Sequence, residues 1–107
     1  LTPLSANWHP GAAKLWMRCN DAGAIQASHN ITSIADTAIG VVTVTIATDF
    51  SGVNYAVVAS CGSTKFVDIK ESGANQPAAG TFRMESWDVA GAAADPGSYW
   101  VVAFGDQ

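Results

Sequence analysis

The sequence predicts an all-β domain, an antiparallel β-sandwich of the jelly-roll-like kind with about eight short strands. Turn-forming residues recur about every eight to twelve residues, a spacing typical of short strands with tight connections. No segment keeps a helical period over about ten residues. The segment 41–48 instead alternates with period two, because its valines and isoleucine are interleaved with threonines, as a pleated surface prefers.

The chain is expected to begin with an irregular leading segment, residues 1–13, which holds Pro3, Pro10 and Gly11. We expect it to be a linker from an upstream region, because the chain reads as the C-terminal piece of a longer polypeptide. The sandwich domain is expected over residues 14–107. Its strands, in chain order, are expected at 14–19, 24–28, 30–35, 41–48, 55–61, 64–70, 81–89 and 99–104.

The first strand, 14–19, alternates with period two. Turn-forming residues at 20–23 are expected to reverse the chain, so that the strand at 24–28 is its hairpin partner. The strand at 30–35 is followed by an expected loop at 36–40 that ends in glycine. Two faces are expected for the first strand, one carrying Leu15, Met17 and Cys19 and the other carrying Lys14, Trp16 and Arg18.

In the strand at 81–89 the apolar residues change from even to odd positions. Phe82 and Met84 occupy even positions, whereas Trp87 and Val89 occupy odd ones. We expect a β-bulge near residues 85–86, because one extra residue would return Trp87 to the core.

The last strand, 99–104, carries no charge, glycine or proline, so both of its faces are apolar. A strand with two apolar faces is covered on both sides. We expect another copy of the chain to cover the outer face. The residues expected at this oligomer interface are Trp16, Trp100 and Val102.

The amino-acid composition favours a protein whose surface is largely covered by partners. Hydrophobic residues make up 49% of the chain and charged residues 13%, about half the usual quarter. The net charge is −4 and the five basic residues are scattered, so nucleic acid is not an expected partner. No apolar run is long enough for membrane insertion, and no cofactor is expected.

No catalytic or metal-binding motif is found. His9 and His29 have no ligand at metal-binding spacing. The acidic pairs Glu85 with Asp88, and Asp68 with Glu71, are three residues apart and point to opposite faces of a regular strand. We therefore expect that the protein is not an enzyme.

Three further residues carry expectations of their own. Cys19 and Cys61 lie in apolar strand contexts and are expected to be free, buried thiols. Asn30 opens an Asn-Ile-Thr triplet that matches a glycosylation acceptor, but we expect it to be a turn or strand-start residue.

Recognition is expected on the loops, where side chains vary without disturbing a core. The longest candidates are 71–80 and 91–98. Asn75 and Gln76 offer amides that can bond to sugar hydroxyls, and Tyr99 offers a stacking ring if it is not buried in the interface. Both loops can equally be simple connections.

The chain also resembles, in order, a domain common in tail-fibre and related proteins of tailed phages and prophages. Residues 13–20, Ala-Lys-Leu-Trp-Met-Arg-Cys-Asn, are similar to the Lys-Ala-Trp-Val-Asn-Phe-Asn opening of that domain. The stretch 25–34, with its Asn-Ile-Thr-Ser-Ile end, is similar to an Ile-Arg-x-Ser-x-Asn-Val-Ser-Ser-Ile stretch. Residues 41–48 and 54–58 match its next two strands and 102–107 its end, whereas 62–97 show only general likeness.

This resemblance implies a C-terminal, trimeric virion appendage domain that attaches to a bacterial surface glycan or protein. It implies contact with other virion proteins and assembly in the bacterial cytoplasm, and it carries over no catalytic residue. Two other functions remain open, a purely structural trimerisation domain and a monomeric carbohydrate-binding module. The module would explain the tryptophans but not the two-sided apolar strands.

Overall fold

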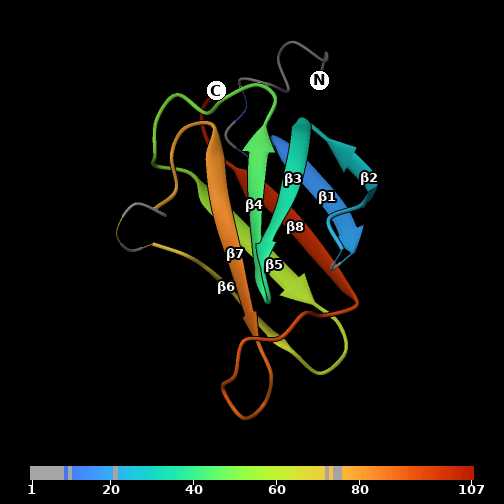
Figure 1. The fold of residues 1–107 in the computed structure, drawn as a ribbon. Helices are drawn as coiled ribbons and strands as arrows, with labels where there is room; N and C mark the ends of the chain where they lie inside the picture. Colours follow the sequence, from blue (N-terminus) through green and yellow to red (C-terminus); the bar gives the residue numbers. More distant parts are fainter. Residues whose placement is uncertain (1–8, 10, 21, 72, 74–75) are drawn as a thin grey trace.

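The computed structural model describes residues 9, 11–20, 22–71, 73 and 76–107 (Figure 1). Asn75 lies outside the described residues. The described residues form eight β-strands, β1 (Leu15–Asn20), β2 (Ile25–His29), β3 (Ile31–Ala38), β4 (Val41–Ile46), β5 (Ala56–Cys61), β6 (Phe66–Ile69), β7 (Thr81–Trp87) and β8 (Ser98–Phe104). The predicted antiparallel β-sandwich of about eight strands is confirmed.

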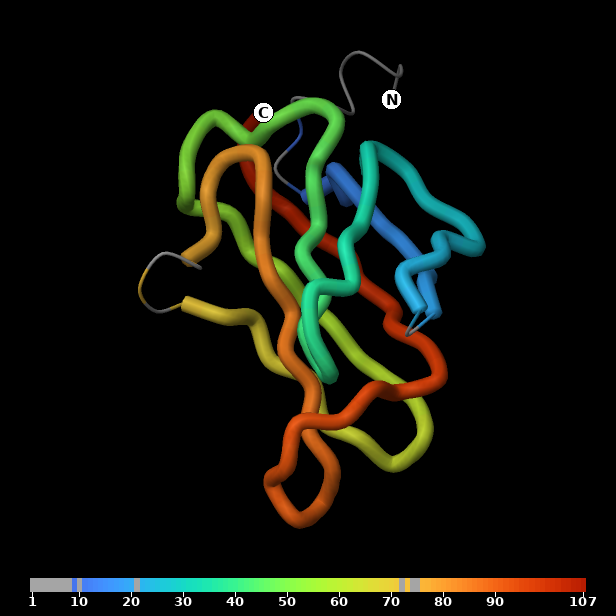
Figure 2. The backbone as a smooth tube through the Cα atoms, in the orientation of Figure 1, coloured from blue at the N-terminus to red at the C-terminus, as the bar shows by residue number. Residues whose placement is uncertain are grey.

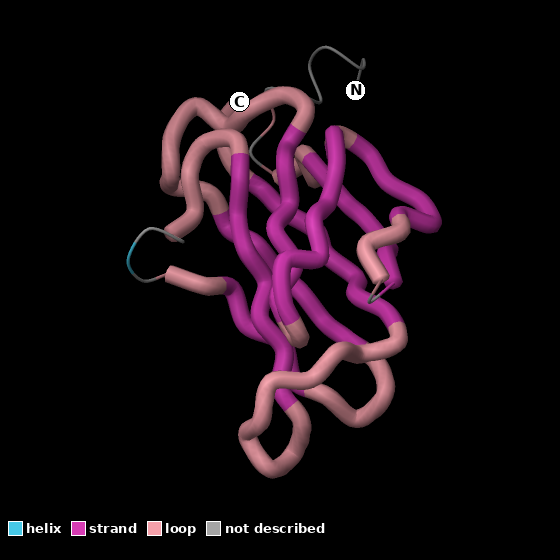
Figure 3. The backbone as a smooth tube through the Cα atoms, in the orientation of Figure 1, coloured by secondary structure: helices cyan, strands magenta, loops and turns pink. Residues whose placement is uncertain are grey.

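The strands form two antiparallel sheets of four among the described residues. Sheet A has the order β2-β1-β8-β5, and sheet B has the order β3-β4-β7-β6. Figure 1 shows the two sheets stacked, with β4 and β7 crossing in front of β8 and β5. The connections gather at the two ends of the sheets (Figure 3), and the chain crosses between the sheets there (Figure 2).

Alternating side chains from both sheets meet between the layers. The inward positions are apolar because each strand follows period two, as in β4, where every second residue is buried. Tyr99, Phe82 and Leu15 are among the largest fully buried side chains. The other buried apolar residues are Met17, Cys19, Val42, Val44, Ile46, Phe50, Met84, Val101 and Ala103.

The bulge predicted in the seventh strand is absent, since β7 pairs with β4 and β6 in unbroken register. Ser86, not Trp87, takes the inward position, and Trp87 faces outward opposite Phe66. The Ser86 hydroxyl lies 2.8 Å from the Tyr99 hydroxyl and donates to Ala94 O at 2.7 Å. A buried polar side chain with such partners costs little, so the core accepts a serine where the sequence favoured a tryptophan.

The end of β3 also differs from expectation. Strand β3 continues to Ala38, through a segment expected to be a loop, because Asp36 and Ala38 pair with Val42 and Val41 across an irregular register. The turn that follows requires Gly40, whose φ is 70° and whose added Cβ would lie 2.5 Å from Ser86 O.

Lys14 does not share the outer face with Trp16, as the alternation predicted. It precedes β1 and is 2% exposed. Its Nζ donates to the carbonyl oxygens of His9 at 2.5 Å and Ala12 at 3.2 Å. These bonds hold the ammonium group against His9 and Ala12, so the outer face of β1 begins at Trp16.

Asn30 occupies the corner between β2 in sheet A and β3 in sheet B, which confirms it as a turn residue. Its φ is 60°, a conformation that asparagine tolerates better than most residues. Its Nδ2 donates to Lys14 O and Thr48 O, both at 3.1 Å, and its Oδ1 accepts from Thr48 N at 2.6 Å. The amide that glycosylation would use is therefore engaged in joining three segments.

Candidate functional site

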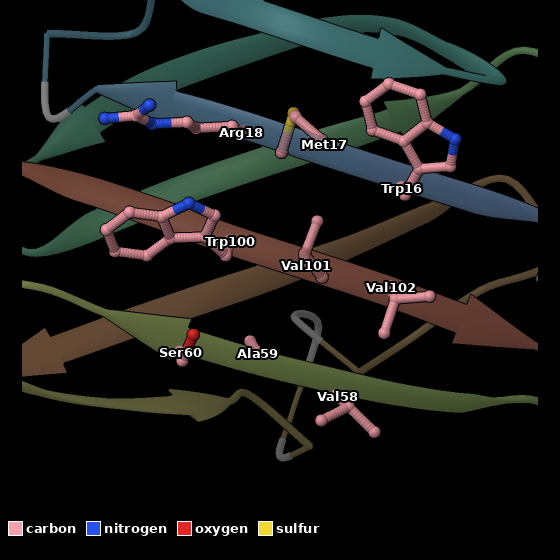
Figure 4. A pocket seen from close by; sticks show the side chains of 9 residues that line it. All are labelled: Trp16, Met17, Arg18, Val58, Ala59, Ser60, Trp100, Val101 and Val102. Carbon is pink, nitrogen blue, oxygen red and sulfur yellow. The ribbon is translucent and has the colours of Figure 1, made fainter.

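The outer face of sheet A carries a row of large apolar side chains, drawn in Figure 4. The outward residues of β1, β8 and β5 line a shallow groove of about 380 Å³. We call this surface the tryptophan face, and it consists of Trp16, Arg18, Val58, Ser60, Trp100 and Val102.

Strand register sets the layout of this face. Val102 in β8 pairs with Trp16 in β1 on one side and with Val58 in β5 on the other. The neighbouring row places Trp100 between Arg18 and Ser60. The two indole rings therefore lie on adjacent strands and in adjacent rows, diagonally across the groove (Figure 4).

These side chains are accessible although they are apolar. Trp16 is 46% exposed, Trp100 41% and Val58 60%. Trp and Val in contiguous exposed positions are unusual on a monomer, where such patches mark interaction sites. The Arg18 guanidinium lies 5.3 Å from the centroid of the Trp100 ring, within cation–π range, so the one charged side chain of the face also covers an indole.

The outer face of sheet B has a different character. Its central strands turn threonines outward in β4 and charged residues outward in β7. The residues concerned are Thr43, Thr45, Thr81, Arg83 and Glu85. These central positions of sheet B are more polar than the tryptophan face, although Trp87 and the 60% exposed Phe66 also face outward from sheet B.

The structure brings the predicted interface residues Trp16, Trp100 and Val102 together on one surface. The sequence pattern predicted these three residues but not Val58 and Ser60. Those two join the surface because β5 lies beside β8, and only the sheet order shows this. Strand periodicity alone cannot reveal which strands are neighbours.

Of the predicted binding residues, the structure describes Tyr99 and Gln76, and it places them in different surroundings. Tyr99 is fully buried, so its ring cannot stack on a ligand, and that expectation is wrong. The sequence already indicated that Tyr99 is buried, because adjacent residues of a strand face opposite sides and Trp100 faces outward. Gln76 is exposed in the loop between β6 and β7, while Asn75 lies outside the described residues.

The acidic and histidine residues that the structure describes form no metal site. Within the described ranges, no group of three or more His, Cys, Asp or Glu side chains is placed to hold an ion. Asp88 Oδ1 accepts hydrogen bonds from Ala90 N and Ala92 N, which makes it a turn residue. In that same part of the chain, no helix has the length and apolarity needed to cross a membrane.

Both cysteines are free, and they flank Tyr99. Cys19 in β1 and Cys61 in β5 are each its direct partner, on opposite sides of β8. Two strand spacings separate their Cα atoms by roughly 9–10 Å, beyond the ~7 Å limit for a disulfide. Cys19 is buried as predicted, whereas Cys61 is half-buried.

We expect the two thiols to react at different rates. Burial raises the pKa of Cys19 to about 11, so only about one thiol in a thousand is ionised at pH 8. Burial also raises the pKa of Cys61, but the Lys65 ammonium opposes the shift. Labelling with a thiol-specific reagent should modify Cys61 first in the native protein. A Cys61→Ser variant that still reacts at the denatured rate would show that Cys19 is accessible.

Comparison of the chain with protein-family models, with curated proteins and with solved structures found no match.

Proposed function

We propose that this domain is the C-terminal module of a phage tail fibre or a similar virion appendage. It self-associates as a trimer through the tryptophan face and presents its loops to a bacterial surface glycan or protein. The observation that carries the proposal is the groove in which Trp16, Trp100 and Val58 stand exposed on one sheet face.

Three features support a second copy as the occupant of this face. The face carries one charged side chain, Arg18, so copies can approach with little electrostatic desolvation. Tryptophan and arginine are enriched at the centres of protein interfaces. The low charged fraction of the whole chain, 13%, fits a surface of which part is covered. The ordered resemblance described above supports an appendage.

A monomeric carbohydrate-binding module is the second candidate. The two indole rings on one open face favour it, since aromatic rings stack on the C–H faces of sugars. The two candidates differ in whether Trp16 and Trp100 are covered by protein when no sugar is present. A purely structural trimerisation domain would share the first arrangement but would bind no receptor.

The oligomeric state of the isolated domain separates these candidates. Size-exclusion chromatography with light scattering should give the mass of a trimer at micromolar concentration. A monomer that binds soluble polysaccharides, with loss of binding in Trp16→Ala, would establish the carbohydrate-binding module instead. A monomer that binds none would contradict the proposed use of this face altogether.

A further inference from the structure

A second hollow lies on the outer face of sheet B, on the other side of the sandwich from the tryptophan face. It measures about 320 Å³, at the lower end of the range for small-molecule sites, about 300–1,000 Å³. It is formed by β6, by the start of the loop that joins β6 to β7, and by the outward residues of β7. The residues that line it are Asp68, Ile69, Lys70, Glu71, Glu85 and Trp87.

Register places an aromatic row, of which Trp87 lines the hollow, beside a row of two carboxylates that both line it. Trp87 is the cross-strand partner of Phe66, which is 60% exposed. In the next row of the same face, Asp68 is the partner of Glu85. The sequence pattern missed this carboxylate pair, because residues 17 positions apart become neighbours only through the register of the hairpin.

The carboxylate pair is costly to the fold as it stands. Like charges directly opposite each other in a sheet are destabilising. One cation relieves the pair, since Lys70 Nζ lies 3.4 Å from Glu85 Oε1, and the Glu85 side chain is only 18% exposed. An arrangement that costs stability beside the exposed Phe66 and the half-buried Trp87 is typical of a binding site.

We infer that this hollow binds a neutral or amino saccharide. The Trp87 side chain lines the hollow, and an indole ring can stack on the C–H groups of a pyranose. Asp68 and Glu85 offer acceptors for hydroxyl or ammonium donors, and Lys70 offers a donor for ring or hydroxyl oxygens. Three carboxylates against one ammonium group give the lining a net charge of −2, which disfavours uronic acids and phosphorylated sugars. This site uses no residue of the tryptophan face, so it and the proposed function can fail separately.

Titration of the ¹⁵N-labelled domain followed by NMR tests the site. The probes are glucose, N-acetylglucosamine, glucosamine and glucuronic acid. We expect saturable shifts of the Trp87 indole and of the β6–β7 amides with the first three sugars, and shifts at least about tenfold weaker with glucuronic acid. Absence of saturable shifts, or equal shifts with glucuronic acid, would overturn the inference.

Variants distinguish this site from general surface binding. Trp87→Ala should abolish the shifts, and Asp68→Ala should weaken the apparent affinity at least about tenfold. Asp68→Asn keeps one acceptor oxygen and should retain neutral sugars better than glucosamine. Val53→Ala, at an exposed apolar residue that lines neither this hollow nor the tryptophan face, is the control and should leave the titration unchanged. If Trp87→Ala does not fold, the exposed Asp68 variants decide the question, because undiminished binding in both would exclude this hollow.

Discussion

Replacing Trp100 with aspartate should dissociate the assembly while leaving the domain folded. The side chain points outward from β8 and is 41% exposed, so the isolated sandwich loses little by the change. In a trimer built on the tryptophan face, however, it would bury an unpaired carboxylate, which is strongly unfavourable. Loss of a central tryptophan alone typically costs 2 kcal/mol or more, so the dissociation constant should rise by more than roughly 30-fold.

Light scattering and circular dichroism of the same samples measure this result. Phe66→Asp is the matched control, because Phe66 is also an exposed aromatic residue on a strand, but on sheet B. The control should keep the mass of the parent protein. Trp100→Asp and Trp16→Asp proteins that are folded and unchanged in mass would show that self-association does not use this face.

Replacing Asn30 with alanine should lower the free energy of unfolding by roughly 4 kcal/mol. Three hydrogen bonds to the backbone at Lys14 and Thr48 are lost, each worth about 1 kcal/mol. Alanine also pays about 1 kcal/mol for a left-handed conformation at φ 60°. Chemical denaturation followed by tryptophan fluorescence gives the change.

Two further variants separate these causes. Asn30→Gly keeps the left-handed backbone but loses the side-chain bonds, so it should be less destabilising than alanine. Asn30→Asp keeps the acceptor for Thr48 N but loses both donors, and should fall between alanine and the parent protein. Equal stability of all four proteins would mean that the Asn30 side chain does not hold the two sheets together.

The sequence predicted local structure well because alternation is a property of neighbouring residues. β4 follows period two so closely that its inward and outward residues could be assigned from the sequence. The same reasoning gave a wrong prediction at β7, where Trp87 was expected in the core because it is apolar. The core there holds Ser86, whose hydroxyl is satisfied by Tyr99, a residue 13 positions away.

The candidate surfaces depended on information that a linear pattern does not contain. Trp16, Trp100 and Val102 were predicted to face outward, but their union with Val58 requires β5 to lie beside β8. Asp68 and Glu85 likewise meet only because the β6–β7 hairpin fixes one register. Lys14 left the expected outer face because carbonyl groups of the leading segment engage its ammonium group.

The sequence by itself therefore determined the all-β class, the number of strands and their order along the chain, and for most strands which side chains face the core. These follow from backbone geometry and from apolar alternation within each strand. Tertiary structure alone decided which strands are neighbours and that Tyr99 is buried. It also decided that the exposed tryptophans gather on the outer face of sheet A and that the pair Asp68 and Glu85 lies on the outer face of sheet B. The reason is physical, because strand pairing is settled by long-range packing of two whole sheets, and no local pattern encodes that choice.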